Sequence, residues 1–170
     1  MSTREIPIDR PIEEKIRWAE ESYRHVADNL HEDEEIKALL LKFKEAVRES
    51  HEEMSVVGLD DECRECEEKE GGSCCGAGLE NRYSGTLLLA NLMLDRILPK
   101  YRNDPKGCFF LGDQGCTLLA RHVICVNYIC KKLLDRIDPK DLSVLREKEG
   151  VELDLLFTLH EKIKQYLRKV

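Results

Sequence analysis

The residues of this chain best suited to chemistry are its eight cysteines, which all lie between residues 63 and 130 of a 170-residue sequence. Thiolates are soft ligands, and a group of them that includes one pair separated by two residues suits a metal ion or an iron–sulfur cluster. We therefore predict that the metal ligands are drawn from all eight: Cys63, Cys66, Cys74, Cys75, Cys108, Cys116, Cys125 and Cys130.

The redox compartment decides between a bound metal and disulfide bridges. The N-terminus is charged and lacks the apolar run of a secretory signal, and no stretch approaches the roughly 18 apolar residues of a membrane span. These features predict a cytoplasmic protein whose thiols stay reduced, which favours a metal. The net charge of −7 argues against nucleic acid as a partner, because phosphate binding needs a basic surface. Neither a nucleic-acid partner nor a membrane is expected.

The segments that must position the cysteines have helical patterns. Apolar residues recur at spacings of three and four in residues 11–30, 33–47 and 153–167, which is typical of amphipathic helices. Asp138 and Pro139 predict the start of the last of these helices, with the aspartate as its cap.

A fourth segment, residues 84–98, is apolar on nearly all sides and is bounded by a capping Ser84 and by Pro99. Such a helix is expected at the centre of the fold, buried within the monomer or forming the seam of a homodimer. No segment shows the alternation of a strand. We predict a single all-α domain, 1–170, with an N-terminal helical part, a cysteine-rich part and C-terminal helices at 1–58, 59–130 and 131–170.

Two irregular inserts interrupt the helices, at residues 60–82 and 101–115. The first is strongly polar apart from its cysteines, so burial cannot offset its ordering entropy and it should be disordered by itself. Bonds between thiolates and a metal would supply the missing free energy. We therefore expect the two cysteine-rich loops to converge on a shared metal or cluster site.

The first two pairs of cysteines have different spacings. Cys63-x-x-Cys66 is a knuckle pattern that zinc sites, clusters and redox pairs share, although a thioredoxin-type pair would require a βαβ context that is absent. Cys74 and Cys75 are adjacent, and neighbouring side chains diverge. One of these two is therefore expected to be a ligand while the other packs or serves a second site.

The later residues leave alternatives open. On one continuous helix, Cys116, Cys125 and Cys130 would face different sides, so either the helix breaks here or not all three are ligands. Cys125 and Cys130 also suit the role of small buried apolar residues. His122 is either a ligand or a hydrogen-bonded structural residue. Arg121 either holds the thiolates by charge-assisted hydrogen bonds or forms an ion pair on a helix surface.

The segment from residue 63 to residue 130 resembles the CxxCxxCC proteins, which include YkgJ-like proteins and are described as zinc- or iron-chelating domains. The resemblance rests on Cys63-x-x-Cys66, on Cys74-Cys75, and on the block that runs from Cys108 through Arg121 to Cys125. Seven residues separate Cys66 from Cys74 where the family gap is short, and His122 stands where the family usually has proline. The resemblance implies a metal or cluster site.

Two functions from different classes follow. The first is an iron–sulfur protein for redox or electron-transfer-linked chemistry, which would have a protein redox partner; cysteine-only ligation and more thiols than one tetrahedral site needs favour it. The second is a zinc-stabilised structural or interaction module. Zinc modules often have two matching knuckles, and this chain has one. No catalytic residue or substrate pocket is readable, so an enzymatic activity stays open.

Overall fold

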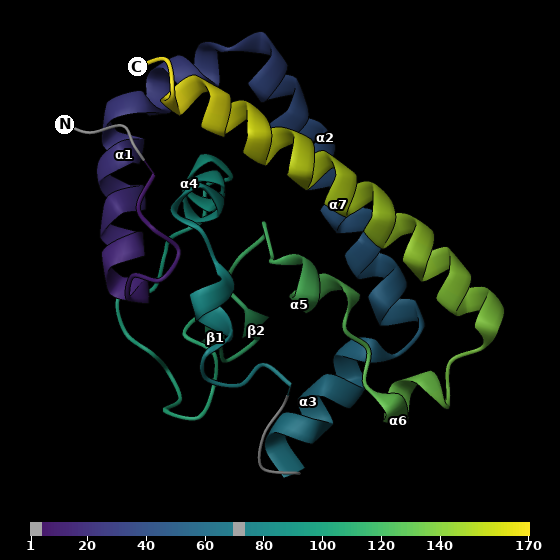
Figure 1. Ribbon diagram of the computed structural model, residues 1–170. Helices are drawn as coiled ribbons and strands as arrows, with labels where there is room; N and C mark the ends of the chain where they lie inside the picture. Colours follow the sequence, from purple (N-terminus) through teal and green to yellow (C-terminus); the bar gives the residue numbers. More distant parts are fainter. Residues whose placement is uncertain (1–4, 70–73) are drawn as a thin grey trace.

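The computed structural model describes residues 5–69 and 74–170, and these are mostly helical (Figure 1). The longer helices are α1 (Ile12–Glu32), α2 (Glu34–Val56), α3 (Leu59–Lys69), α4 (Gly85–Met93) and α7 (Pro139–Leu167). The shorter elements are the 3-10 helix η1 (Leu79–Arg82), the helices α5 (Val123–Asn127) and α6 (Lys131–Leu134), and the strands β1 (Leu111–Gly112) and β2 (Gly115–Cys116). The predicted helical class is confirmed. The antiparallel β1–β2 hairpin was not predicted, because two-residue strands are too short to show alternation.

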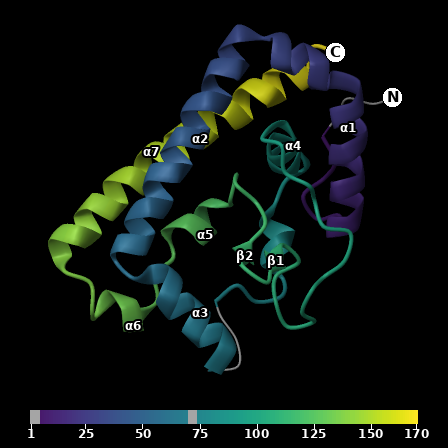
Figure 2. The ribbon, with the colours of Figure 1, turned by 180° about the vertical axis from the view of Figure 1, so that it is seen from behind.

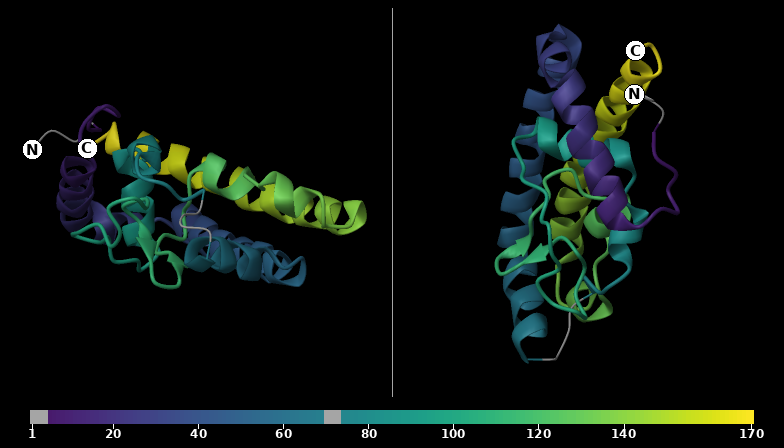
Figure 3. Two further views of the ribbon diagram at one scale, coloured as in Figure 1. Left: turned by 90° about the horizontal axis from the view of Figure 1, so that it is seen from below. Right: turned by 90° about the vertical axis from the view of Figure 1, so that its left-hand side faces the viewer.

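Helices α2 and α7 run antiparallel and lie side by side along much of their lengths (Figures 1 and 2). Their facing stripes bury Phe43 and Val47 of α2 and Leu159 of α7. The starts of both helices are capped by aspartates: Asp33 accepts from two N–H groups of α2, and Asp138 accepts from an N–H group of α7, with a proline in the first turn. The predicted start of the last helix is confirmed. Figure 3 shows α1 at one end of the α2–α7 pair.

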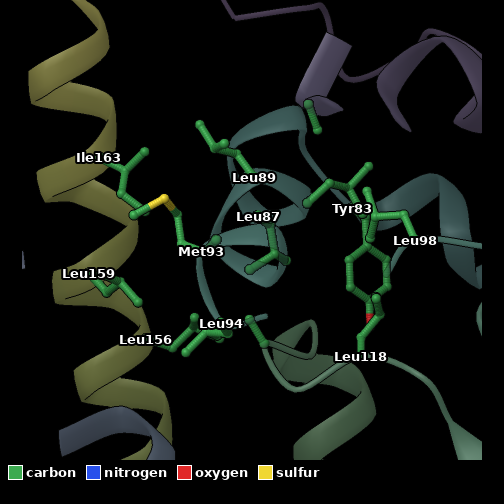
Figure 4. Close-up of a cluster of buried hydrophobic side chains, with 14 of the residues drawn as sticks. Tyr83, Leu87, Leu89, Met93, Leu94, Leu98, Leu118, Leu156, Leu159 and Ile163 are labelled. Carbon is green, nitrogen blue, oxygen red and sulfur yellow. The ribbon is translucent and has the colours of Figure 1, made fainter. Parts of the chain in front are cut away.

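Helix α4 fills the space between α1 and α7. Figure 4 shows the side chains of this segment facing those of α7, among them Met93, Leu94, Leu156, Leu159 and Ile163. Ser84 caps α4 as predicted, accepting from the N–H of Leu87 at 3.1 Å. Gly85 allows the close approach to α1, because a Cβ at this position would lie 2.5 Å from the ring of Trp18. The monomer's own helices therefore cover the apolar surface of α4.

The predicted central helix is shorter than expected. It ends at Met93 rather than continuing to residue 98, and Asp95 adopts a left-handed backbone conformation with φ of 62°. A residue in this conformation just after a helix is a common way for a helix to end. Leu98 is buried nevertheless, because the chain turns back onto the core.

The first insert is more ordered than the sequence predicts. Residues 59–69 form α3 and residues 79–82 form η1, whereas residues 70–73 lie outside the described residues. The expectation of a disordered stretch over residues 60–82 is therefore wrong for these two parts. The polar composition hid a short amphipathic helix whose apolar face consists of Leu59 and Cys63. Within 5–69 and 74–170, no helix has the length and apolar character needed to span a membrane.

A hydrogen bond between Ser84 Oγ and His160 Nε2, 3.2 Å long, joins the start of α4 to α7. Burial lowers the pKa of His160 from its ordinary value of 6.5, against a raising influence of the Glu5 carboxylate. A histidine whose pKa is lower in the folded state contributes stability above about pH 6.5, and this contribution is lost as the pH falls through the folded-state pKa. The unfolded chain binds the proton more readily over that range.

We expect the free energy of unfolding to fall between about pH 7.5 and pH 5.5, and His160→Gln to reduce this pH dependence. Urea denaturation at both pH values measures the effect. His122 also has a pKa lowered by burial, so part of the slope should persist in the variant. A slope that is unchanged in His160→Gln would contradict the assignment.

Candidate metal centre

Helix α3 carries the first cysteine pair. Residues three apart share one face of a helix, so Cys63 and Cys66 point to the same side of α3. The pair is therefore helical, which corrects the prediction of a knuckle in an irregular loop. Cys63 and Cys130 both pack against one apolar cluster, which consists of Leu59, Ile129, Leu133 and Leu145. This cluster joins the α3 pair to the last cysteine.

The second pair lies on a segment that is joined by backbone hydrogen bonds to the second insert. Gly76 and Gly107 form an antiparallel bridge, and the N–H of Cys108 donates to the carbonyl of Cys75 at 2.7 Å. The N–H of Ala77 donates to the carbonyl of Lys106 at 2.8 Å. The two cysteine-bearing inserts, about 30 residues apart in the sequence, thus meet at the backbone of Cys75 and Cys108.

A buried carboxylate holds this junction together. Glu80, whose side chain is 4% exposed, accepts from the N–H groups of Gly78 and Phe109 and pairs with Arg102. Arg102 also donates to the carbonyl of Gly107. Burial alone would raise the pKa of Glu80, but the hydrogen bonds from Arg102 and from backbone N–H groups lower it below its ordinary value. Glu80 therefore stays ionised and connects both inserts.

Glu80→Ala should destabilise the fold by roughly 2–4 kcal/mol, because it leaves the Arg102 charge and two N–H groups without their acceptor. The matched control is Asp95→Asn, which breaks the exposed Lys44–Asp95 pair at 2.8 Å. An exposed pair of this kind contributes about 1 kcal/mol or less. Chemical denaturation of both variants measures the difference. Equal losses in the two variants would show that Glu80 does not hold the junction.

The third cysteine-bearing stretch does not form one helix. Cys116 ends the β1–β2 hairpin, Cys125 lies on the single-turn helix α5, and Cys130 stands at the start of α6. The helix break that the spacing left as one alternative is therefore present. His122 accepts from the N–H of Ile124 at 3.2 Å and caps α5, which supports its structural role.

Two buried polar side chains position this stretch. Asn91 of α4 accepts from the N–H groups of Leu119 and Ala120 at 2.9 and 3.0 Å, and it donates to the carbonyl of Ala120 at 3.0 Å. The hydroxyl of Tyr83 lies 3.9 Å from Cys125 Sγ and accepts from the N–H of His122 at 3.2 Å. Asn91 is one of two polar residues in the otherwise apolar helix α4, which was a signal in the sequence. Tyr83 gave none.

The thiol of Cys75 lies at the centre of the electrostatic contacts among the cysteines. Thiols from three other parts of the chain interact with it: Cys63 of α3, Cys116 of the hairpin and Cys125 of α5. Its neighbour Cys74 is exposed and hydrogen-bonds to it. Cys66 and Cys130 interact with Cys63, and Cys108 interacts with Cys116 and Cys125. Every cysteine is therefore within electrostatic range of at least one other.

The surroundings raise the pKa of five of these thiols: Cys63, Cys74, Cys108, Cys116 and Cys125. Burial, followed by the neighbouring thiols, raises the pKa of Cys63 to about 11. Burial also raises the pKa values of Cys108 and Cys116 to about 11. Cys116 is an exposed residue, but the protein around its thiol removes enough water to raise the pKa. For Cys74 the hydrogen bond with Cys75 is the main cause of the increase. Reactive and redox-active thiols have lowered pKa values, so these surroundings do not suit a thiol nucleophile or a thioredoxin-type pair.

The arrangement brings donors near one another without placing them as ligands. All eight cysteines are free thiols. In the described part of the chain, no group of three or more histidine, cysteine, aspartate or glutamate residues is placed to hold a metal ion. The cysteine thiols are of the right chemical type for a metal centre. To bind a metal ion, however, their sulfur atoms would have to move closer together.

Arg121 is neither on a surface nor hydrogen-bonded to a described thiol. Its side chain is 9% exposed and pairs with Glu152 of α7, which is fully buried, at 3.4 Å. A second contact joins it to Met54 Sδ at 4.0 Å. Its charge nevertheless counteracts the burial that raises the pKa values of Cys116 and Cys125. The buried ion pair with Glu152 was not predicted, because Glu152 lies on a helix 31 positions away.

The chain matches no family model, no curated protein and no solved structure. The resemblance to the CxxCxxCC proteins therefore stays a prediction from the cysteine pattern.

Proposed function

We propose that this protein binds an iron–sulfur cluster through cysteine thiolates and serves redox or electron-transfer-linked chemistry. One observation carries the proposal: Cys75, whose backbone bonds to Cys108, interacts electrostatically with thiols from three separate segments. Thiolates gathered in this way repel one another, which is one cause of their raised pKa values. A cation at their centre would relieve that repulsion.

The donor chemistry favours a cluster over a zinc ion. The eight cysteine thiols are the main soft donors of the region, and their number exceeds the four that a closed tetrahedral zinc site needs. The imidazole of His122 already caps a helix. We place the ligands among Cys63, Cys75, Cys116, Cys125 and their cysteine neighbours. When bound, such a cluster supplies one-electron transfer.

The chain's own residues would supply three things. The thiols lose their protons and bind, so metal uptake releases protons and strengthens as the pH rises. Arg121 offsets part of the negative charge of the ligands. The hydroxyl of Tyr83 offers a hydrogen bond to Cys125 Sγ, and hydrogen bonds to cluster sulfurs are known to adjust reduction potentials. A protein redox partner belongs to this proposal.

Metal and sulfide analysis of protein purified without oxygen tests the proposal. We expect a brown protein with iron and acid-labile sulfide in near-equal amounts. A colourless protein with stoichiometric zinc would replace the proposal with the zinc-stabilised structural or interaction module. A metal-free protein that is as compact and as stable as the purified form would refute both.

Changing both residues of the α3 pair, Cys63→Ala and Cys66→Ala, should remove the bound metal and make residues 60–82 more sensitive to protease, because metal binding and folding are coupled. Arg64→Ala is the matched control, since Arg64 lies on the same helix and is exposed. Metal content and limited proteolysis measure the effect. Wild-type metal content in the double variant would remove this pair from the ligand set.

A further inference from the structure

A group of polar and charged side chains is buried between α2, α7 and the segment before α5. Glu149 and Glu152 of α7 belong to it, with side chains that are 1% and 0% exposed. Each member of the group has a buried polar atom without a hydrogen-bond partner among the described residues: Ser50 Oγ, Arg121 Nε, Glu149 Oε1 and Glu152 Oε2. Buried polar atoms are rarely left unpaired, so a ligand for these four atoms is expected.

Direct contacts place Arg121 between the two long helices. Its Nη2 atom lies 3.4 Å from Glu152 Oε1 of α7 and 4.0 Å from Met54 Sδ of α2. Glu149 lies three residues before Glu152, so both carboxylates are on one face of α7. Glu149 Oε2 pairs with Arg146 at 2.6 Å, which leaves its second oxygen, Oε1, directed to the interior without a partner.

Ser50 approaches the same place from α2. It lies four residues before Met54, so the two side chains share one face of that helix. The register of the antiparallel helices agrees with this position, because Lys148 Nζ of α7 lies 2.6 Å from Glu53 Oε2 of α2. One helical turn from that pair, in opposite chain directions, Ser50 comes to the level of Glu152. The four unpaired atoms therefore belong to one junction.

The hydrogen-bonding capacity of these atoms is balanced between donors and acceptors. Arg121 Nε has one N–H and can only donate, and the Ser50 hydroxyl has one proton to donate. The unpaired oxygens of Glu149 and Glu152 accept when the carboxylates are ionised. A water molecule has two protons and two lone pairs, so a single water can pair with all four atoms. Buried waters make about three such bonds, with a range of two to four.

Charged occupants fit this set of atoms less well. A metal or ammonium ion has no lone pair for the N–H of Arg121 and would be repelled by the guanidinium. An anion would instead meet two carboxylate oxygens. In the described part of the chain, no histidine, cysteine, aspartate and glutamate side chains are grouped to hold a metal ion. Arg121 and Arg146 already pair with the two carboxylates, so a neutral ligand preserves the charge balance.

A proton shared directly between the carboxylates would be a different way to pair their free oxygens. Burial raises the pKa of Glu149 and the charge of Glu152 raises it further, whereas Arg146 and Arg121 oppose this increase. The free oxygens, however, have no hydrogen bond to each other. The 3.4 Å between Arg121 and Glu152 also exceeds the roughly 2.7–2.9 Å of a charge-assisted hydrogen bond. These loose contacts favour a bridging molecule over direct pairing.

We propose that one water molecule is bound between α2 and α7 by Ser50, Arg121, Glu149 and Glu152. It donates to the two free carboxylate oxygens and accepts from the Arg121 N–H and the Ser50 hydroxyl. The bound water joins α2, α7 and the segment before α5, and it helps both buried carboxylates to stay ionised. The site contains no thiol and does not depend on a bound metal.

A crystal structure of the purified protein, at a resolution that shows ordered water, tests the proposal. We expect one water oxygen within hydrogen-bond distance of at least three of the four atoms. In solution, the same water should give water–protein NOEs of a long-lived internal water to amide protons of α2 and α7. A direct bond between the oxygens of Glu149 and Glu152, a metal ion in this position, or the lack of a long-lived water would overturn the proposal.

Ser50→Val tests the site by displacement. It removes one partner of the water, and its methyl groups occupy the space beside Glu152. The folded variant should lose the NOEs of the internal water. Ser143→Ala is the matched control, because Ser143 is exposed on α7, and it should retain them. NOEs that persist in Ser50→Val would contradict the assignment. The measurements on the wild type decide the question even where this variant does not fold.

Discussion

Cys75→Ser should abolish metal binding, and its effect should exceed that of any other single cysteine change. The reason is its place: it interacts with thiols of three separate segments, and its carbonyl accepts from the N–H of Cys108. A serine hydroxyl is a far poorer ligand for a soft metal, although the backbone bond stays intact. Metal and sulfide content after anaerobic purification measure the loss.

Two comparisons give this result its meaning. Ala77→Ser adds a hydroxyl to the same segment at an exposed position and should keep full metal content. Cys74→Ser tests the neighbouring thiol, which is exposed and interacts with Cys75 and Cys63. A greater loss of metal in Cys74→Ser than in Cys75→Ser would reverse the assignment of the central ligand.

Asn91→Ala should be among the most destabilising single changes in the chain. It removes the acceptor of two N–H groups, the buried one of Ala120 and the partly buried one of Leu119, and a donor to the carbonyl of Ala120. Each buried polar group left unpaired costs about 1–3 kcal/mol, so we expect a loss on the order of 4 kcal/mol. Whole domains have only about 5–15 kcal/mol of stability. Urea denaturation monitored by circular dichroism measures the change.

The same variant also reports on the candidate metal centre. The backbone that Asn91 holds lies between Cys116 and Arg121, so any bound cluster should show altered visible absorption even where the protein stays folded. Asn127→Ala on the exposed side of α5 is the control and should change stability by no more than about 0.5 kcal/mol. A near-native unfolding free energy in Asn91→Ala would contradict the positioning role.

The long helices could be predicted from the sequence because each has one continuous apolar stripe. The helix caps at Ser84 and Asp138 could also be predicted, because a cap depends only on residues close to it in the sequence. The end of α4 could not, because the left-handed turn at Asp95 interrupts a sequence that continues to look helical. Helix α3 was missed because its apolar face rests on Leu59 and on Cys63, a residue that the pattern assigned to a metal knuckle.

The sequence allowed us to predict the cysteine donors of the candidate site, but not the buried ion pairs that position them. Cysteines are recognisable from their type, whereas their geometry depends on contacts between distant segments. Glu80 and Arg102 are 22 positions apart, and Arg121 and Glu152 are 31 apart. Charged residues are common in this chain, so nothing in the local sequence separates these buried pairs from the many exposed ones. Only the fold shows which carboxylates are buried.

The pairing of α2 with α7 has a consequence for biosynthesis. Residues 139–167 must emerge from the ribosome before they can meet residues 34–56, so the apolar stripe of α2 stays uncovered while the intervening residues are made. Arg121 and its α7 partner Glu152 cannot associate earlier either. The nascent polypeptide would therefore need protection from aggregation until α7 emerges.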